Sequence, residues 1–359
     1  MKESKLYCLV MAGGQGTRFW PSSVSKKPKQ YLPLISDKSL LEETLVRFDG
    51  LVAPEDRYVI TVKAQEQLVK DSAGDKIGKD GVIFEPSGRN TGPCILLSLA
   101  SLMANGASST DVVAIVPSDH VILNHQGFRD TLKKAAEISL GLSKIVTIGI
   151  KPNFPHTGFG YIHRGQEVST SAFDVAEFKE KPDLETAKSY VASGEYFWNA
   201  GMFVGTIERL LKEFESCAPT MFEHYNDLKD AANDFSKTGV VYDRIPKDSI
   251  DYAIMEKSKE VMTIPAEFDW NDLGSWDALE SVLEKKDDNY VGQAKEVFFE
   301  KASGNIVFAP DKFVSLIEVN DLVVVSTENN ILVIPKEKAQ DVKKAVEYLK
   351  TKDFGKDHL

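Results

Sequence analysis

Cysteines and histidines are few in this chain, and neither is spaced for a disulfide framework or a metal site. The three cysteines, Cys8, Cys94 and Cys217, lie far apart without a C-x-x-C pair. That usage is typical of reduced, mostly buried thiols in a cytoplasmic protein. The six histidines include no H-x-x-x-H pair, so a zinc site is not expected.

Long apolar runs and an excess of positive charge are missing as well. No run of 18 apolar residues occurs, and the short apolar run at Leu6 is followed by a glycine-rich loop rather than a secretory cleavage site. The 359 residues carry a net charge of −11, which argues against a nucleic-acid surface but leaves room for a local nucleotide pocket. We therefore expect a soluble, cytoplasmic protein with no nucleic-acid or membrane partner.

Apolar segments with strand and helix patterns alternate through the first 150 residues. Strands are expected at residues 6–11, 57–62, 82–84, 111–116 and 144–150, and helices at 39–51, 93–105 and 127–140. Further strands are expected at 159–163, 175–180 and 261–264, and further helices at 184–193, 207–215, 250–256 and 275–284. This alternation predicts an α/β fold with a Rossmann-like, doubly wound, mostly parallel sheet.

The pattern changes near residue 290. Short aliphatic runs at 306–308, 314–317, 322–326 and 331–334 alternate with Asn, Asp and Gly turns, and an amphipathic helix is expected at 336–349. We place the boundary near residue 287. The chain is then divided into a first domain, 1–287, and a small C-terminal β domain, 288–359.

The stretch 6–30 is the segment around which we expect the first domain to be organised. Its apolar run stops at Gly13, Gly14 and Gly16, whose missing Cβ atoms let a ligand approach the backbone. Arg18 and Lys29 add two positive charges suited to phosphate oxygens. Neither the Walker motif nor the dinucleotide fingerprint G-x-G-x-x-G fits. A plain glycine-rich turn with a surface arginine is the alternative.

The whole string GGxGTRxWP…PKQ resembles the signature of the sugar-nucleotide pyrophosphorylases, also called sugar-1-phosphate nucleotidyltransferases. Trp20 and Gln30 resemble the mannose-1-phosphate guanylyltransferase branch, and similar motifs continue from about residue 6 to 350. The resemblance implies that Arg18 and Lys29 hold the β and γ phosphates of GTP. It implies nucleotide contacts from the loop residues Ala12, Gly13, Gly14, Gly16, Thr17 and Arg18.

The loop at 85–92 follows a strand and precedes the helix at Pro93. From the residues alone, Asn90 or Thr91 merely caps that helix. The string EPSGRNTGP resembles the family's loop for the guanine base, although Gly92 stands where alanine is usual. The resemblance implies nucleotide contacts from Pro86, Arg89, Asn90 and, at the end of the strand before Asp119, Ser118.

Asp119 and Asp272 are candidate ligands for Mg²⁺. Each ends a strand or lies in a Trp-flanked turn, with no obvious structural partner in the sequence, and a lone aspartate there is usually a cap. Mg²⁺ needs only one or two carboxylates when substrate phosphates and water supply the rest. PSDH and WNDLGSW resemble the family motifs whose aspartates hold this ion.

The string FKEKP resembles the family motif for the sugar phosphate, although adjacent charges of this kind are most often a solvated strand end. The resemblance implies that Lys181 reaches the sugar phosphate and Glu180 a sugar hydroxyl. Other walls of the sugar pocket are implied at Gly160, Asn199, Gly201, Asp251 and Glu256. His156 stands where the family often has arginine.

The implied reaction is GTP + α-D-mannose 1-phosphate → GDP-mannose + pyrophosphate, by direct transfer. A phosphate nucleophile is already ionised near neutral pH, so no general base is required, and positioning with charge neutralisation by Arg18, Lys29 and Lys181 suffices. Another sugar or base, or a regulatory homologue without chemistry, remains an alternative. The C-terminal domain resembles the family's left-handed β-helix-like end, whose aliphatic edges predict a homodimer. Longer relatives add a cupin domain with phosphomannose isomerase activity, which is not expected here.

Overall fold

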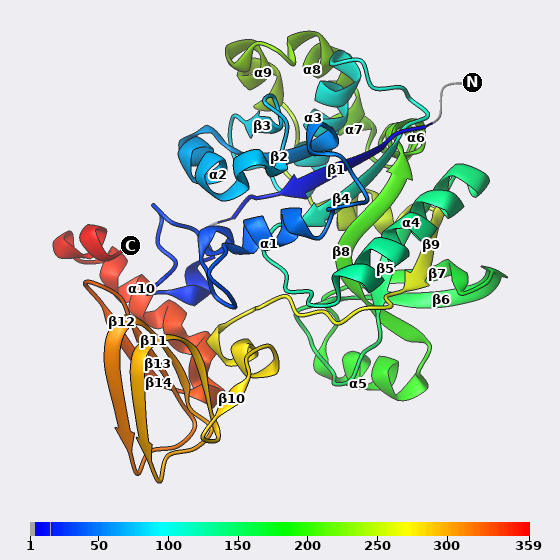
Figure 1. Ribbon diagram of the computed structural model, residues 1–359. Coiled ribbons are helices and arrows are strands. Elements are labelled where there is room, and N and C mark those ends of the chain that lie inside the picture. Colours follow the sequence, from blue (N-terminus) through cyan, green and yellow to red (C-terminus); the bar gives the residue numbers. More distant parts are fainter. Residues whose placement is uncertain (1–3, 15) are drawn as a thin grey trace.

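The computed structural model describes residues 4–14 and 16–359, and these form a large mixed α/β unit and a smaller β unit (Figure 1). The large unit is built on a nine-stranded sheet in the order β3-β2-β1-β4-β8-β5-β9-β7-β6. The small unit is built on a five-stranded sheet in the order β10-β11-β12-β13-β14. The predicted fold class, a mostly parallel α/β sheet with a C-terminal β unit, is confirmed.

Four strands form the parallel half of the large sheet. They are β1 (Leu6–Met11), β2 (Arg57–Val62), β3 (Val82–Glu85) and β4 (Val112–Pro117). All three pairings among them are parallel. Their residues are apolar and largely buried, as expected where helices cover both faces of a sheet. Helices α1 (Leu40–Val46), α2 (Glu66–Ala73), α3 (Thr91–Ala104) and α4 (His125–Leu142) follow β1 to β4 in turn.

The second half of the sheet is joined through β8 (Tyr196–Thr206), which runs antiparallel between β4 and β5 (Ile145–Ile150). Beyond β5 lie β9 (Val261–Pro265), β7 (Ala172–Glu180) and β6 (Gly160–Ser169). In the described sheet, β7 and β8 run opposite to the other seven strands. The sequence did not predict β8, because its glycine and asparagine interrupt the apolar pattern.

Helices of this half are α5 (Leu184–Ser193), α6 (Ile207–Cys217), α7 (Pro219–Phe222), α8 (Tyr225–Ala231) and α9 (Phe235–Tyr242). The helix predicted at 250–256 is a π-helix, Asp251–Met255, and the one predicted at 275–284 is a shorter 3-10 helix, Trp276–Ser281. Buried apolar residues form one cluster around α3 and another around α1 and α4, on the two faces of the sheet. None of the described helices is both long and apolar enough to cross a membrane.

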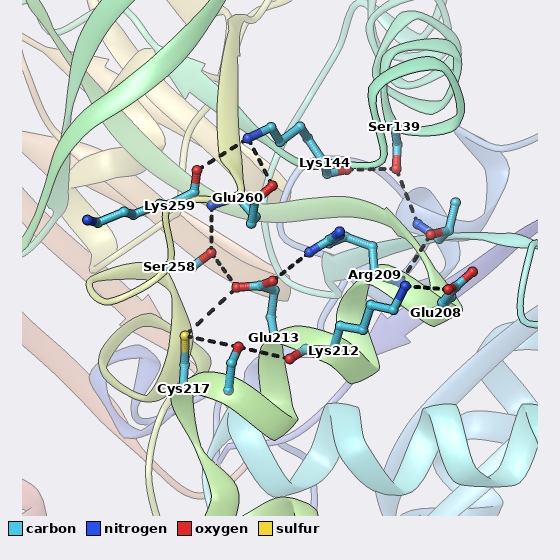
Figure 2. Close-up of polar contacts among 12 residues, drawn as sticks. Ser139, Lys144, Glu208, Arg209, Lys212, Glu213, Cys217, Ser258, Lys259 and Glu260 are labelled. Atoms are coloured by element: carbon cyan, nitrogen blue, oxygen red, sulfur yellow. Dashed lines mark hydrogen bonds and ion pairs between the residues drawn. The ribbon is translucent and has the colours of Figure 1, made fainter.

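A polar cluster joins helix α6 to the segment before β9 (Figure 2). This segment lies at the amino end of β9, whereas the glycine-rich loop follows the carboxyl end of β1. Glu213 is 4% exposed and accepts hydrogen bonds from Arg209 (2.9 Å) and from the Ser258 hydroxyl (2.6 Å). Cys217 lies 3.8 Å from the same carboxylate, and burial raises the pKa of its thiol. A buried carboxylate is stable only with such partners, so we assign this cluster a structural role.

The small unit contains β10 (Lys285–Lys286), β11 (Asn289–Glu300), β12 (Ile306–Ile317), β13 (Leu322–Ser326) and β14 (Ile331–Pro335). The parallel pairing of β11, β12 and β13 is that of a β-helix. The two runs predicted at 306–308 and 314–317 are one strand, because Asp311 with φ of 60° allows a bulge rather than a turn. The predicted boundary near 287 falls beside β10 and stays a prediction.

The C-terminal segment returns to the signature segment near the N-terminus (Figure 1). Helix α10 (Val342–Lys350) packs in one apolar cluster with Phe19, Trp20 and Trp276. The Trp20 indole donates to the main-chain oxygen of His358 (2.8 Å), and the Trp276 indole donates to that of Trp20 (3.0 Å). The small unit therefore braces the turn that carries Arg18.

Candidate active site

Three adjoining cavities lie at the carboxyl ends of the parallel strands. A cavity of about 570 Å³ is bordered by the glycine loop and by β6 and β8, and we call it the main cavity because it borders most of the predicted site residues. A second, larger cavity of about 1040 Å³ lies beside it. A third cavity, of about 310 Å³, is lined by residues 16–19, which we call the signature turn. Asp272 borders all three cavities. This is the edge at which open α/β sheets bind ligands.

The loop after β1 is held tightly at its base, and it is open at Gly14. The main-chain oxygen of Ala12 accepts hydrogen bonds from Gln30 (2.9 Å) and from the Thr61 hydroxyl (3.1 Å). Gly14 has φ of 97°, and a Cβ there would meet no described atom within 4 Å. Gly16 has φ of 57°, and a Cβ there would overlap the Cβ of Lys29. Glycine is thus required both for conformation and for close packing.

A buried carboxylate that the sequence did not indicate lies at the end of β3. Glu85 is 6% exposed, borders the main cavity, and accepts a hydrogen bond of 2.5 Å from the Tyr242 hydroxyl. Burial raises the pKa of Glu85. Arg89, further along the same loop, donates to the Ile245 main-chain oxygen (2.8 Å) and to Asp243 (3.1 Å). Helix α9 and its following loop therefore shape this end of the cavity.

Lys29 is buried between the two predicted metal ligands. Its ammonium lies 3.0 Å from Oδ2 of Asp119 and donates to the main-chain oxygen of Asp272 (2.7 Å), and the residue is 5% exposed. The expectation that Asp119 has no structural partner is therefore wrong. Burial acts to raise the pKa of Asp119, but the charge of Lys29 opposes it and leaves that pKa below its ordinary value. The Asp272 carboxylate makes no hydrogen bond or ion pair with any described residue.

Two acidic side chains, Glu180 and Asp251, lie together in the main cavity, in a part that we call its acidic end. Asn199 donates to the Asp251 carboxyl (2.9 Å), and burial, with the nearby charge of Glu180, raises the pKa of Asp251 to about 6. Oε2 of Glu180 is buried without a hydrogen-bond partner among the described residues. A Cβ on Gly160 would overlap that oxygen. The arrangement offers carboxyl acceptors suited to the hydroxyl groups of a polyol.

Lys181 lies where the main and second cavities meet. Glu180 borders the main cavity and Lys181 the second, and the Lys181 ammonium lies 2.6 Å from Oε1 of Glu180. Burial acts to lower the pKa of Lys181, but the bond to Glu180 outweighs it and raises that pKa. Phe159 and Trp270 border both cavities and form the wall between them, and Trp198 packs against both rings from the second cavity. Lys181 and Arg18 are both cations of the second cavity.

Most of the predicted site residues border one of the three cavities. Those that do are Gly13, Gly14, Gly16, Thr17, Arg18, Lys29, Arg89, Asn90, Asp119, Gly160, Glu180, Lys181, Asn199, Gly201, Asp251 and Asp272. Ala12, Pro86, Ser118 and Glu256 do not: Ala12 and Ser118 are buried, and Glu256 accepts a hydrogen bond from the Glu180 main chain (3.1 Å). Asn90 also caps α3 by accepting a hydrogen bond from the Thr91 N–H (2.9 Å), so the capping interpretation is confirmed, and its contact with a nucleotide stays a prediction.

The carboxylate ligands in these cavities suit a hard divalent cation only when a bound substrate supplies further oxygen ligands to the same ion. In the described part of the chain, no group of three or more His, Cys, Asp or Glu side chains is placed to bind a metal. Asp119 and Asp272 border the same two cavities. Two carboxylates completed by phosphate oxygens and water are a set that Mg²⁺ accepts.

The fold and the cavities together define an α/β protein with a ligand crevice at the carboxyl edge of its sheet and with a C-terminal β unit. Residues 7–289 match the family model described as nucleotidyl transferase, and residues 299–349 match the "MannoseP isomerase/GMP-like beta-helix domain". The chain belongs to the nucleotidyl transferase family, and it is therefore an enzyme of that class.

Bacterial proteins resemble it over almost its full length. It is 36% identical over 360 residues to a mannose-1-phosphate guanylyltransferase of Escherichia coli (strain K12), covering 98% of this chain and 74% of that one. A Klebsiella pneumoniae protein of the same name is 37% identical, with 95% and 73% covered. A solved structure from Thermus thermophilus, described as mannose-1-phosphate geranyltransferase, superposes with a TM-score of 0.87 at 33% identity and covers 96% of this chain and 99% of its own.

Proposed function

We propose that this enzyme makes GDP-mannose and pyrophosphate from GTP and α-D-mannose 1-phosphate. The observation that supports it is the position of Asp272, which borders the glycine-loop cavity, the signature-turn cavity and the Lys181 cavity at once. A group placed there is within reach of a nucleotide, its phosphates and an incoming phosphate. The names of the relatives favour guanine and mannose over other bases and sugars.

In this proposal the nucleotide extends from Arg89 and Asn90, past the glycine loop, to the signature turn. Main-chain N–H groups of the loop bind phosphate oxygens. Arg18, which borders the second cavity and the cavity of the signature turn, holds the β and γ phosphates. Lys29 is already bonded to Asp119 and to the Asp272 main chain, so it acts on the phosphates partly by holding these two segments together.

The sugar phosphate occupies the acidic end of the main cavity. Glu180 and Asp251 accept hydrogen bonds from the sugar hydroxyls, and Asn199 orients Asp251. Lys181 directs the phosphate nucleophile toward the α-phosphorus, where the new P–O bond forms as the bond to pyrophosphate breaks. No proton has to be removed from the nucleophile, because its oxygen is already ionised.

Mg²⁺ is the proposed cofactor, and Asp119 and Asp272 would hold it. When bound, such an ion neutralises charge on the phosphates during transfer. The protein's own contribution is to keep the free carboxylate of Asp272 and the Lys29-paired carboxylate of Asp119 facing the same cavities. The expected cytoplasmic location stays a prediction.

The substrate pair is tested by measuring pyrophosphate release with each of the four nucleoside triphosphates and several hexose 1-phosphates. We expect GTP with mannose 1-phosphate to give the highest kcat/KM, because the base loop and the acidic sugar end match that pair in the family signature. A higher value for glucose 1-phosphate with dTTP or UTP would reassign the substrates. No turnover with any pair would favour a regulatory homologue, although Arg18, Lys29, Asp119, Lys181 and Asp272 all stand in place.

We also propose a homodimer formed through the small β unit. Its described edge strand β14 exposes Ile331 (71%) and Val333 (59%), and β12 of the same sheet exposes Phe313 (62%). An apolar edge strand offers unpaired main-chain groups that a second copy of the same strand can pair with. A two-fold axis would then bury the same residues on both copies.

Light scattering at micromolar concentration checks the dimer. We expect twice the monomer mass for the parent chain and the monomer mass for the double variant Ile331→Lys, Val333→Lys, because two charges on an interface edge oppose pairing. Leu140→Lys, which changes an apolar residue on α4 that is 46% exposed, is the matched control and should stay dimeric. A monomer mass for the parent chain would contradict the proposed dimer.

A further inference from the structure

His120 borders the same small cavity as Arg18, Lys29, Asp119 and Asp272. The family motifs described above give this histidine no role. His120 follows Asp119 at the end of β4, and it borders both the main cavity and the small cavity of the signature turn. Its main-chain oxygen accepts a hydrogen bond of 2.6 Å from Arg47, which is 1% exposed. The backbone that carries the ring is therefore firmly held.

Trp270 determines which nitrogen of that ring carries the proton. The Trp270 indole N–H points at Nδ1 of His120 at 3.1 Å, with the two rings perpendicular and 5.3 Å apart. An indole nitrogen is only a donor, so Nδ1 must accept. A neutral imidazole that accepts at Nδ1 carries its hydrogen on Nε2.

A short β-bridge brings these two rings together although they are 150 positions apart. Val121 and Asn271 exchange main-chain hydrogen bonds of 2.8 and 3.0 Å, and His120 and Trp270 are the residues just before them. The same antiparallel bridge brings Asp272, the residue after Asn271, opposite His120. Nε2 of His120 makes no hydrogen bond to any residue in the described ranges.

We propose that His120 donates its Nε2–H to a phosphate oxygen of the bound nucleotide, with Trp270 as the positioning residue that fixes the tautomer. This inference rests on the proposed function. Arg18, Lys29, Asp119 and Asp272 are the charged groups of the small cavity. A neutral donor among them binds an oxygen without adding charge, and it binds more strongly as negative charge develops there during transfer.

The tautomer is tested by NMR on protein labelled with ¹⁵N-histidine, with the His120 signals assigned by their loss in His120→Asn. Long-range ¹H–¹⁵N correlations should show the Nε2–H form in the parent and a mixture of both forms in Trp270→Phe. Addition of GTP, or of inorganic pyrophosphate without a base, should shift the Nε2 signal. An Nδ1–H form in the parent, or an unmoved Nε2 signal when calorimetry shows binding, would overturn the proposal.

Kinetics separate a donor from a packing residue. The amide nitrogen of glutamine reaches the position of Nε2, whereas that of asparagine reaches only the position of Nδ1. We expect His120→Gln to keep kcat within about fivefold and His120→Asn to lower kcat by roughly 10- to 50-fold. The second loss is somewhat smaller than is usual for a single preorganised donor, because nearby cations also stabilise the charge on the phosphate. KM for GTP should change less than kcat. Equal losses in the two variants would show that His120 only packs.

His163→Asn is the control, since His163 borders none of the three cavities and stacks on Tyr196. These measurements also distinguish a failure of the proposed substrates from a failure of the proposed role of His120. If the parent uses another base or sugar, the proposed substrates fail, but the pyrophosphate-induced shift and the contrast between glutamine and asparagine are unaffected when measured with the pair that reacts.

Discussion

Asp272→Asn and Asp119→Asn should each lower kcat by about two orders of magnitude or more, the size of effect expected when a main source of charge stabilisation at a transferring phosphate is lost. Both substitutions keep the shape of the side chain and remove its charge. In the proposed mechanism they remove the two carboxylates that hold the divalent cation. Pyrophosphate release under saturating substrates measures the loss, and Asp130→Asn, at an exposed position of α4, provides the control.

Stability without ligands should distinguish the two variants. The simplest expectation from the sequence is unchanged or higher stability for both, because a like-charge pair is relieved. The ion pair between Lys29 and Asp119 changes that expectation for Asp119. Asp119→Asn leaves a buried ammonium without its carboxylate, so we expect its Tm to fall by roughly 2–5 °C, whereas Asp272→Asn should unfold at the parent temperature. If either variant kept its activity but showed a large drop in Tm, the replaced aspartate would be a structural cap rather than a metal ligand.

Lys181→Ala should reduce kcat/KM for the sugar phosphate by about 100-fold, shared between a higher KM and a lower kcat, because the cation both binds and aims the nucleophile. Its ammonium lies at the border between the main and second cavities, 2.6 Å from Glu180. The glycine loop, which binds the nucleotide in the proposed mechanism, follows another strand. The GTP dissociation constant, measured by calorimetry, should therefore change by less than about twofold.

Two matched variants sharpen that test. Lys179→Ala removes an exposed lysine two positions earlier on β7, one that borders none of the three cavities, and it should leave both constants unchanged. Lys181→Arg keeps the charge and should recover part of the activity. If Lys181→Ala weakens GTP binding as much as sugar-phosphate binding, Lys181 belongs to the nucleotide side of the crevice.

The local pattern of the sequence was enough to predict the parallel half of the sheet and the convergence of its loops. Apolar runs alternating with helices predicted β1 to β5, and parallel pairing then requires that β1 and β4 end at the same edge. The Ser118 N–H bonds to the Met11 oxygen at 3.1 Å, so the glycine loop and Asp119 start side by side. Resemblance of motifs supplied the family, which the comparisons confirm.

Only the tertiary structure decided the partners of the charged and polar groups in the crevice. Periodicity along the chain reports which face of an element is buried, but it carries no information about pairs far apart in sequence. The Tyr242 hydroxyl bonds to Glu85 across 157 positions, and the Lys29 ammonium bonds to Asp119 across 90. These contacts depend on how α9 and the signature segment pack against the sheet, and this packing also leaves Asp272 as the free carboxylate common to all three cavities.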